Sequence, residues 1–311
     1  MKTVRLWDWT LLVVCNLIWA TQFVLLKIVQ VQLGPVMATF LPMALATACL
    51  VAVVWWQRRK SAIKSSLSRA DVWQFVLIGV LGQVVAQLFV TWGVRYSLAS
   101  NAALLMLSLP VITAVMAYFL LGETMSVIRW ISFALAIAGV LECSGIDWHS
   151  LNLTSTDYLL GNLLILCSVG GSAFYNVYSK KLLTRYTPLE VLLYSYYAVV
   201  AVLLPVTVRV EAAGFSVLPH LTPAVWAGVA GLALFQYFAS MVIFLTVLTH
   251  LDATQASLSN YMIPFFGLVI AAITLREKLT GYMILGGLLV LASTLLTTVY
   301  DEHRQRKLAG A

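Results

Sequence analysis

Charged side chains are scarce in this sequence. Of its 311 residues, 10% are Asp, Glu, Lys or Arg, whereas 61% are hydrophobic, and the mean hydropathy is +0.94. Soluble domains carry roughly 25% charged residues, so this chain has too few to cover a surface that faces water. The composition therefore excludes a soluble globular protein and indicates a chain that lies in a lipid bilayer.

Residues that form metal sites, disulfides and catalytic centres are also few. The four cysteines are scattered without a CxxC pair, which argues against a disulfide framework and a zinc site. The four histidines are expected in loops or the C-terminal tail, and no HxxxxD, HExxH or Asp-rich pattern is present. We therefore expect no enzyme activity, no cofactor and no metal site.

The apolar residues form continuous runs instead of alternating with polar ones, which favours helices over a transmembrane β-barrel. A helix that crosses a membrane takes roughly 20 residues, so the chain has room for ten. The expected fold is an all-α polytopic membrane protein. The ten predicted spans are residues 7–29, 33–56, 70–92, 98–121, 127–142, 158–178, 188–208, 223–248, 253–275 and 281–300.

Basic residues indicate the orientation of these spans. Most of the 19 Lys and Arg residues fall in loops and tails on one side of the predicted membrane. The positive-inside rule then places both termini in the cytoplasm, which requires an even number of spans. The short loops suggest a bacterial inner membrane. We expect a monomer or weak homodimer, with the lipid bilayer and a small-molecule substrate as partners and no nucleic acid.

The two halves of the chain match each other at a nearly constant spacing. Each half would hold five spans, an odd number, so the second copy enters the membrane in the opposite orientation. Inverted repeats are typical of transporters that alternate access around a midplane site. The predicted repeats are residues 1–152 and 153–311. The matched pairs are Lys27 with Lys180, Pro35 with Pro188, Trp73 with Trp226, Gln83 with Gln236, Pro110 with Pro264, Leu121 with Leu275 and Glu123 with Glu277.

Two segments of these halves resemble a known family. The run NAALLMLSLP at 101–110 is followed by Leu-Gly-Glu at 121–123, and the run QASLSNYMIP at 255–264 is followed by Leu-Arg-Glu at 275–277. They resemble the tandem EamA domains of the drug/metabolite transporter superfamily, although Arg276 stands where the family usually has Gly. The resemblance covers nearly the whole chain. It implies ten helices, cytoplasmic termini, a central cavity lined by spans one, three, four, six, eight and nine, and export of amino acids, other metabolites or drugs.

Neutral polar side chains within the predicted spans form the candidate substrate cavity. Gln83 and Gln87 are four residues apart and so share one face of a helix, and Gln236 and Ser240 repeat this spacing. Each residue alone is equally compatible with a hydrogen bond between helices, but the repeat favours the cavity for Gln83 and Gln236. The full set is Trp19, Gln22, Gln83, Gln87, Asn101, Ser108, Ser172, Tyr175, Asn176, Gln236, Tyr237, Ser240, Ser257, Asn260 and Tyr261.

Three further residues each have two interpretations. Lys27 either extends to the membrane interface or contacts an anionic group of the substrate. Pro110 and Pro264 are expected in the middle of spans, where each removes a helix hydrogen bond. They serve either as hinges for a rocking motion or as static bends.

The expected function is export of a small metabolite by alternating access, with amino acids or related zwitterionic or amphipathic compounds as the first candidates. Acidic residues are expected only at span ends, which argues against proton or sodium coupling through a buried carboxylate. Organic phosphates would need several Arg or Lys residues in the cavity. The alternatives are multidrug or organic-cation efflux and an organic-phosphate or sugar exchanger, followed by a non-transporting membrane scaffold or an enzyme.

Overall fold

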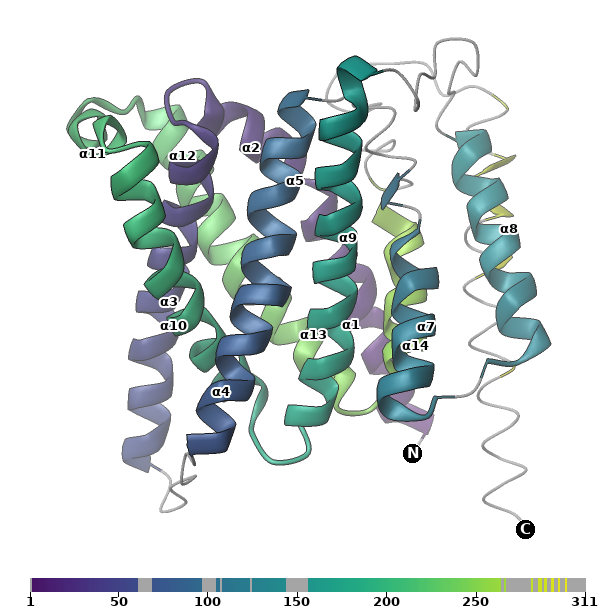
Figure 1. Cartoon of the computed structure of the whole chain (residues 1–311). Helices are drawn as coiled ribbons and strands as arrows, with labels where there is room; N and C mark the ends of the chain where they lie inside the picture. The colour runs from purple at the N-terminus through teal and green to yellow at the C-terminus, as the bar shows by residue number, and fades with distance from the viewer. Residues whose placement is uncertain are drawn as a thin grey trace.

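The computed structural model describes residues 2–60, 69–96, 105–106, 108–123, 125–143 and 156–263, and isolated positions between 266 and 300. Within these residues the protein is all-helical and contains no strand (Figure 1). Six helical segments are long and apolar enough to cross a membrane. They are Trp7–Gln30, Pro35–Arg59, Arg69–Gly93, Leu159–Leu182, Pro188–Val210 and Pro223–Leu248, and two shorter apolar helices, Leu109–Leu121 and Val127–Gly139, accompany them.

These helices confirm an all-α membrane protein. The predicted spans 253–275 and 281–300 lie mostly outside the described residues, so the count of ten stays a prediction. The elements of the first half are α1 (Lys2–Ala20), α2 (Gln22–Gln30), α3 (Pro35–Lys60), α4 (Arg69–Leu77), the π-helix η1 (Ile78–Val84), α5 (Val85–Tyr96), α7 (Leu109–Leu121) and α8 (Val127–Cys143).

The second half begins with the longest helix described. Its elements are α9 (Thr156–Leu182), α10 (Pro188–Val210), α11 (Ala213–Val217), the 3-10 helix η2 (Leu218–His220), α12 (Pro223–Gly231), the π-helix η3 (Leu232–Ala239), α13 (Ser240–Leu248), α14 (Ala253–Leu258) and the 3-10 helix η4 (Ser259–Tyr261). Segment α11 lies at the end of the bundle opposite to the N-terminus (Figure 1).

Local sequence explains where several helices begin and end. Both α10 and α12 start at a Thr-Pro pair, in which the proline fits the first helical turn because its missing N–H has no partner there. The Thr187 hydroxyl accepts a bond from the Glu190 N–H at 3.3 Å, and the Glu190 carboxylate accepts one from the Thr187 N–H at 3.1 Å. This capping box fixes the start of α10. At Gly122, a left-handed φ of 70° ends α7.

Helices of the two halves pack against each other in a crossed arrangement. Helix α9 of the second half packs on η1 and α5 of the first, and α1 of the first half packs on α13 of the second. Helices α3 and α10 contact each other, and each also contacts the π-helix of the opposite half. The apolar core is therefore shared between the halves, and neither half encloses it alone.

Two long spans contain a π-helical segment. The π-helix η1 continues α4 into α5, and η3 continues α12 into α13. Gln83 lies in η1 and Gln236 lies in η3. Segments of this kind occur frequently at functional sites, and no sequence pattern predicted them.

Candidate functional site

Three glutamines form a hydrogen-bonded chain across the interior of the bundle. Gln236 Nε2 donates to Gln22 Oε1 at 2.8 Å, and Gln22 Nε2 donates to Gln87 Oε1 at 3.2 Å. The three residues come from η3, α2 and α5, so the chain joins the two halves. All three belong to the predicted set, and the structure brings them together.

Trp19 and Ser240 extend this chain. The indole Nε1 of Trp19 donates to the Ser240 hydroxyl at 2.9 Å, and that hydroxyl donates to the backbone carbonyl of Gln236. The Trp19 ring also packs against Phe244, with ring centroids 5.3 Å apart. These contacts fix α1 against η3 and α13, so five predicted residues form one connected network: Trp19, Gln22, Gln87, Gln236 and Ser240.

A second group of polar side chains lies between η1, α9 and α10. The Tyr175 hydroxyl lies close to Gln83, Ser179 and Ser195, and we call these four residues the Tyr175 cluster. Among the described residues, the Tyr175 hydroxyl, Gln83 Oε1 and Ser179 Oγ have no hydrogen-bond partner. Gln236 Oε1 also has no partner among the described residues, so Gln83 and Gln236, which the sequence repeat paired, do not bond each other in either direction.

Close backbone contacts place the Tyr175 cluster. A Cβ atom on Gly82 would lie 2.9 Å from the Cβ of Tyr175, and one on Gly79 would lie 2.5 Å from the carbonyl oxygen of Ser195. Real Cβ atoms do not approach other atoms so closely, so η1 needs glycine at both positions to reach α9 and α10. The sequence contained a signal for Ser179, which lies one helical turn after Tyr175, but the candidate set did not include it.

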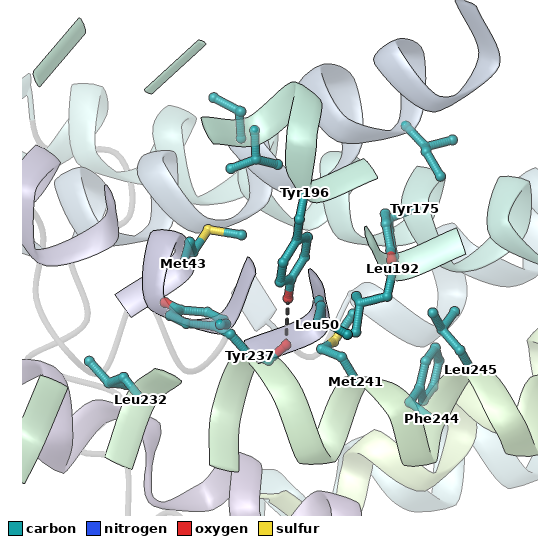
Figure 2. Close-up of a cluster of buried hydrophobic side chains, with 14 of the residues drawn as sticks. Met43, Leu50, Tyr175, Leu192, Tyr196, Leu232, Tyr237, Met241, Phe244 and Leu245 are labelled. Carbon is teal, nitrogen blue, oxygen red and sulfur yellow. Dashed lines mark hydrogen bonds between the residues drawn. The ribbon is translucent and has the colours of Figure 1, made fainter. Parts of the chain in front are cut away.

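Tyr196 and Tyr237 join Tyr175 in the apolar core of the bundle (Figure 2). The Tyr196 hydroxyl donates to the backbone carbonyl of Tyr237 at 2.8 Å, and Figure 2 shows Tyr196 between Tyr237 and Tyr175. Met43 and Leu192 are among the surrounding apolar side chains (Figure 2). The bond joins α10 to η3, which holds the predicted cavity residues Gln236 and Tyr237.

Asn16 is a polar residue that the sequence analysis missed. Its Nδ2 donates to the Ser259 hydroxyl at 2.9 Å and to the Leu12 carbonyl at 2.8 Å. Asn16 lies three residues before Trp19, a spacing that places both on one side of a helix. The carbonyl oxygens of Asn16 and of the neighbouring predicted residue Asn260 have no bond within the described part of the chain.

The remaining predicted residues lie in varied surroundings. Ser108 donates to the Leu105 carbonyl and Ser257 to the Thr254 carbonyl, so both hydroxyls bond their own turn of the chain. Asn176, Tyr261 and Ser172 are buried or half-buried, and Tyr261 packs edge-on against Phe133. Asn101, Pro264 and the side chain of Lys27 lie outside the described residues.

Pro110 differs from its expected position. It lies in the first turn of α7, not in the middle of a helix. A proline in the first turn leaves no helix hydrogen bond unmade, because the N–H groups of that turn have no partner within the helix. Pro110 thus removes no hydrogen bond from α7, and its role as a hinge or a static bend of the predicted span 98–121 stays a prediction.

Charged residues at the end of the bundle near the N-terminus join the two halves. Glu123 accepts bonds from the N–H groups of Ala253 and Thr254, at 2.9 and 3.1 Å, and from the Thr254 hydroxyl at 2.7 Å. Arg129 pairs with Asp252 at 3.1 Å. The motif carboxylate Glu123 thus caps the start of α14, where a negative charge is favourable.

Further polar contacts lie at the same end. Asp8 is buried and pairs with His250 at 3.0 Å, and the Tyr186 hydroxyl donates to Asp71 at 2.8 Å. Burial and this bond to a carboxylate raise the pKa of Tyr186 to about 12. At the opposite end, Glu211 accepts bonds from the N–H groups of Val36 and Met37 at 3.0 and 2.8 Å.

Comparison with known proteins identifies the family. The EamA-like transporter family matches residues 6–143 and again residues 159–299. The chain belongs to the EamA-like transporter family. The predicted resemblance is thus confirmed, as is the expectation of a transporter in place of an enzyme.

Relatives of this EamA-like chain include an uncharacterized transporter from Archaeoglobus fulgidus, 25% identical over 297 residues that form 94% of this chain and 98% of that protein. A protein of Streptantibioticus cattleyicolor named "Probable terminal-alkyne amino-acid exporter" is 27% identical over 237 residues, 76% of each chain. One crystal structure shares the fold, with a TM-score of 0.78 at 15% identity over 94% of this chain and 97% of the other.

Proposed function

We propose that this EamA-like transporter exports small metabolites, amino acids or related zwitterionic or amphipathic compounds, by alternating access through a central cavity. The observation that carries the proposal is the Gln236–Gln22–Gln87 chain, which links both halves inside the bundle. Amide groups donate and accept hydrogen bonds without a net charge. They suit a substrate that carries both donors and acceptors and no net charge.

The helix contacts support two repeats of opposite orientation, residues 1–152 and 153–311. Gln22 and Tyr175 occupy matching positions in the two halves, as do Gln236 and Gln83. Gln22 bonds Gln236, and Tyr175 lies beside Gln83. Inverted repeats produce such paired contacts, and transporters with this symmetry bind their substrates at the repeat interface.

The names of relatives and the local charge support the substrate class. The Streptantibioticus relative is named as an amino-acid exporter. Among the described residues, no charged side chain bonds any member of the glutamine chain. Recognition of an organic phosphate requires Arg or Lys, so amino acids and similar zwitterions are the better fit.

The positions of the acidic residues support movement down a concentration gradient or with weak coupling. In the described part of the chain, Asp71, Glu123, Glu142, Asp157, Glu190, Glu211 and Asp252 lie at or next to helix ends, and Asp8 lies in the second turn of α1, at the start of the apolar span Trp7–Gln30. The Lys and Arg distribution supports an orientation with both termini in the cytoplasm, and the short loops between the predicted spans support a bacterial inner membrane protein.

Purified protein in liposomes tests the proposal. We expect at least one solute from a panel of amino acids and amines to cross faster than in empty vesicles. Gln236→Leu should lower the initial rate about tenfold, which corresponds to about 1.4 kcal/mol of lost binding free energy. Gln30→Leu, at an exposed position at the end of α2, is the matched control and should transport normally.

Three results would contradict parts of the proposal. If no solute of the panel is transported, the proposed export of amino acids and amines is wrong. Transport that stops when a pH gradient is collapsed would show proton coupling and reject the gradient-driven mechanism. Equal rates for the wild type and Gln236→Leu would show that the glutamine chain only holds the helices together and does not bind substrate.

A further inference from the structure

The Tyr175 cluster contains several polar groups that are deeply buried and unpaired. Tyr175, Gln83 and Ser179 are 1%, 3% and 0% exposed. Within the described residues, none of their three oxygen atoms takes part in a hydrogen bond. Each unpaired buried group costs about 1–3 kcal/mol, so three in one place indicate that a ligand satisfies them.

The cluster presents mainly acceptors. Gln83 Oε1 can only accept, and the hydroxyls of Tyr175 and Ser179 each carry two lone pairs. The Ser195 hydroxyl already donates to the Leu192 carbonyl at 2.9 Å, so only its lone pairs are free for a ligand. A water molecule has two hydrogens to donate, whereas an ammonium group has three and no acceptor. The three unpaired oxygens can accept the three hydrogens of an ammonium group, and the two hydroxyl hydrogens of Tyr175 and Ser179 can turn to the carboxylate of the same zwitterion.

The surroundings of the cluster set the net charge of the ligand. No Asp or Glu bonds these four residues in the part of the chain that the structure describes. A bare cation would stay unpaired in a medium of low polarity, which is costly. A zwitterion brings its own carboxylate and avoids that cost.

We propose that the Tyr175 cluster binds the ammonium group of the transported zwitterion. This inference rests on the proposed function and assigns one part of substrate recognition to η1, α9 and α10. It adds Ser179 to the binding residues. It also gives the glycines of η1 a role, because they hold Gln83 against Tyr175 before the substrate arrives.

Competition in liposomes tests the assignment. The labelled probe is the neutral amino acid that the panel transports fastest. The unlabelled competitors are the same amino acid, its N-acetyl derivative without the ammonium group, and its amide derivative without the carboxylate. For leucine these are N-acetylleucine and leucinamide. The variants are Tyr175→Phe, Ser179→Ala and Gln83→Glu. The matched control is Ser132→Ala, which removes another buried, unpaired serine hydroxyl on α8, outside the cluster.

We expect Tyr175→Phe and Ser179→Ala to weaken competition by the parent amino acid about tenfold, the factor for one lost bond to a charged group. Competition by the N-acetyl derivative should not change, because it has no ammonium group to lose. Gln83→Glu adds a negative charge to the cluster. It should therefore strengthen competition by the cationic amide derivative at least tenfold. Ser132→Ala should behave as the wild type.

The stability of each variant separates binding from folding. Removing an unpaired hydroxyl should leave the Tm without substrate unchanged or raise it, while the shift in Tm on adding the amino acid becomes smaller. If Tyr175→Phe and Ser179→Ala weaken all three competitors equally, or none, the assignment is wrong although transport stands. A lower Tm without substrate, together with unchanged competition, would assign the cluster to bound water. Absence of wild-type transport would instead reject the proposed function.

Discussion

The contact between Glu123 and the start of α14 joins the two halves of the chain. Its contribution to the free energy of unfolding can be worked out from the bonds that it contains. Glu123 follows α7, in the first half, and accepts bonds from the Ala253 and Thr254 N–H groups and from the Thr254 hydroxyl. A capping side chain contributes about 1 kcal/mol, a negative charge at a helix N-terminus about 0.5 kcal/mol, and a further hydrogen bond about 1 kcal/mol. We expect Glu123→Ala to cost about 2.5 kcal/mol in total.

Thermal unfolding in detergent, followed by tryptophan fluorescence, measures this cost. At about 2 °C per kcal/mol for a chain of this length, Glu123→Ala should lower Tm by about 5 °C. Glu123→Gln keeps one oxygen acceptor and loses the charge, so its effect should be about half as large. Gln30→Ala, at an exposed position on α2, is the control. If the three variants unfold at the same temperature, the capping bonds do not stabilise the protein and the argument fails.

Three other substitutions give separate tests. Gly82→Ala should lower both Tm and transport, because the new Cβ would lie 2.9 Å from the Cβ of Tyr175; normal values would show that η1 can move away. Tyr186→Phe removes a hydroxyl whose pKa is raised to about 12 by burial and by Asp71. Since the neutral phenol is favoured in the fold, wild-type stability should be full below pH 10 and fall towards pH 12. That loss should be smaller in the variant when Tm is measured against pH. Gln22→Leu removes both bonds of the glutamine chain and should reduce transport more than Gln87→Leu, which removes one.

The membrane architecture was predictable because long apolar runs leave few alternatives. The predicted spans 188–208 and 223–248 agree closely with α10 and with the segment Pro223–Leu248. Each begins at a Thr-Pro pair, one of the strongest local signals for a helix start. These features depend on residues close together in the chain, so one sequence is enough to recognise them.

Features that depend on tertiary contacts were not predictable in the same way. Helical spacing identified Gln22, Gln87 and Gln236 as candidates, but it did not show that Gln22 stands between the other two. A π-helix accommodates an extra residue within an α-helix. The pattern of hydrophobic residues in one sequence does not predict where this happens. Acidic residues were expected at span ends, yet their partners, such as the start of α14 for Glu123, lie more than a hundred residues away.

The two matching contacts differ in a way that bears on alternating access. Gln22 and Gln236 are hydrogen-bonded, whereas Tyr175 and Gln83, at the matching positions, lie together without a bond. If the chain is the inverted-repeat transporter proposed above, rocking of one repeat against the other would exchange the conformations of the two repeats between the access states. The opposite state would then bond Gln83 to Tyr175 and separate Gln236 from Gln22. An ammonium group bound at the Tyr175 cluster would have to leave before that bond forms, so release of the substrate and the change of state would be coupled through Tyr175 and Gln83, which take part in both.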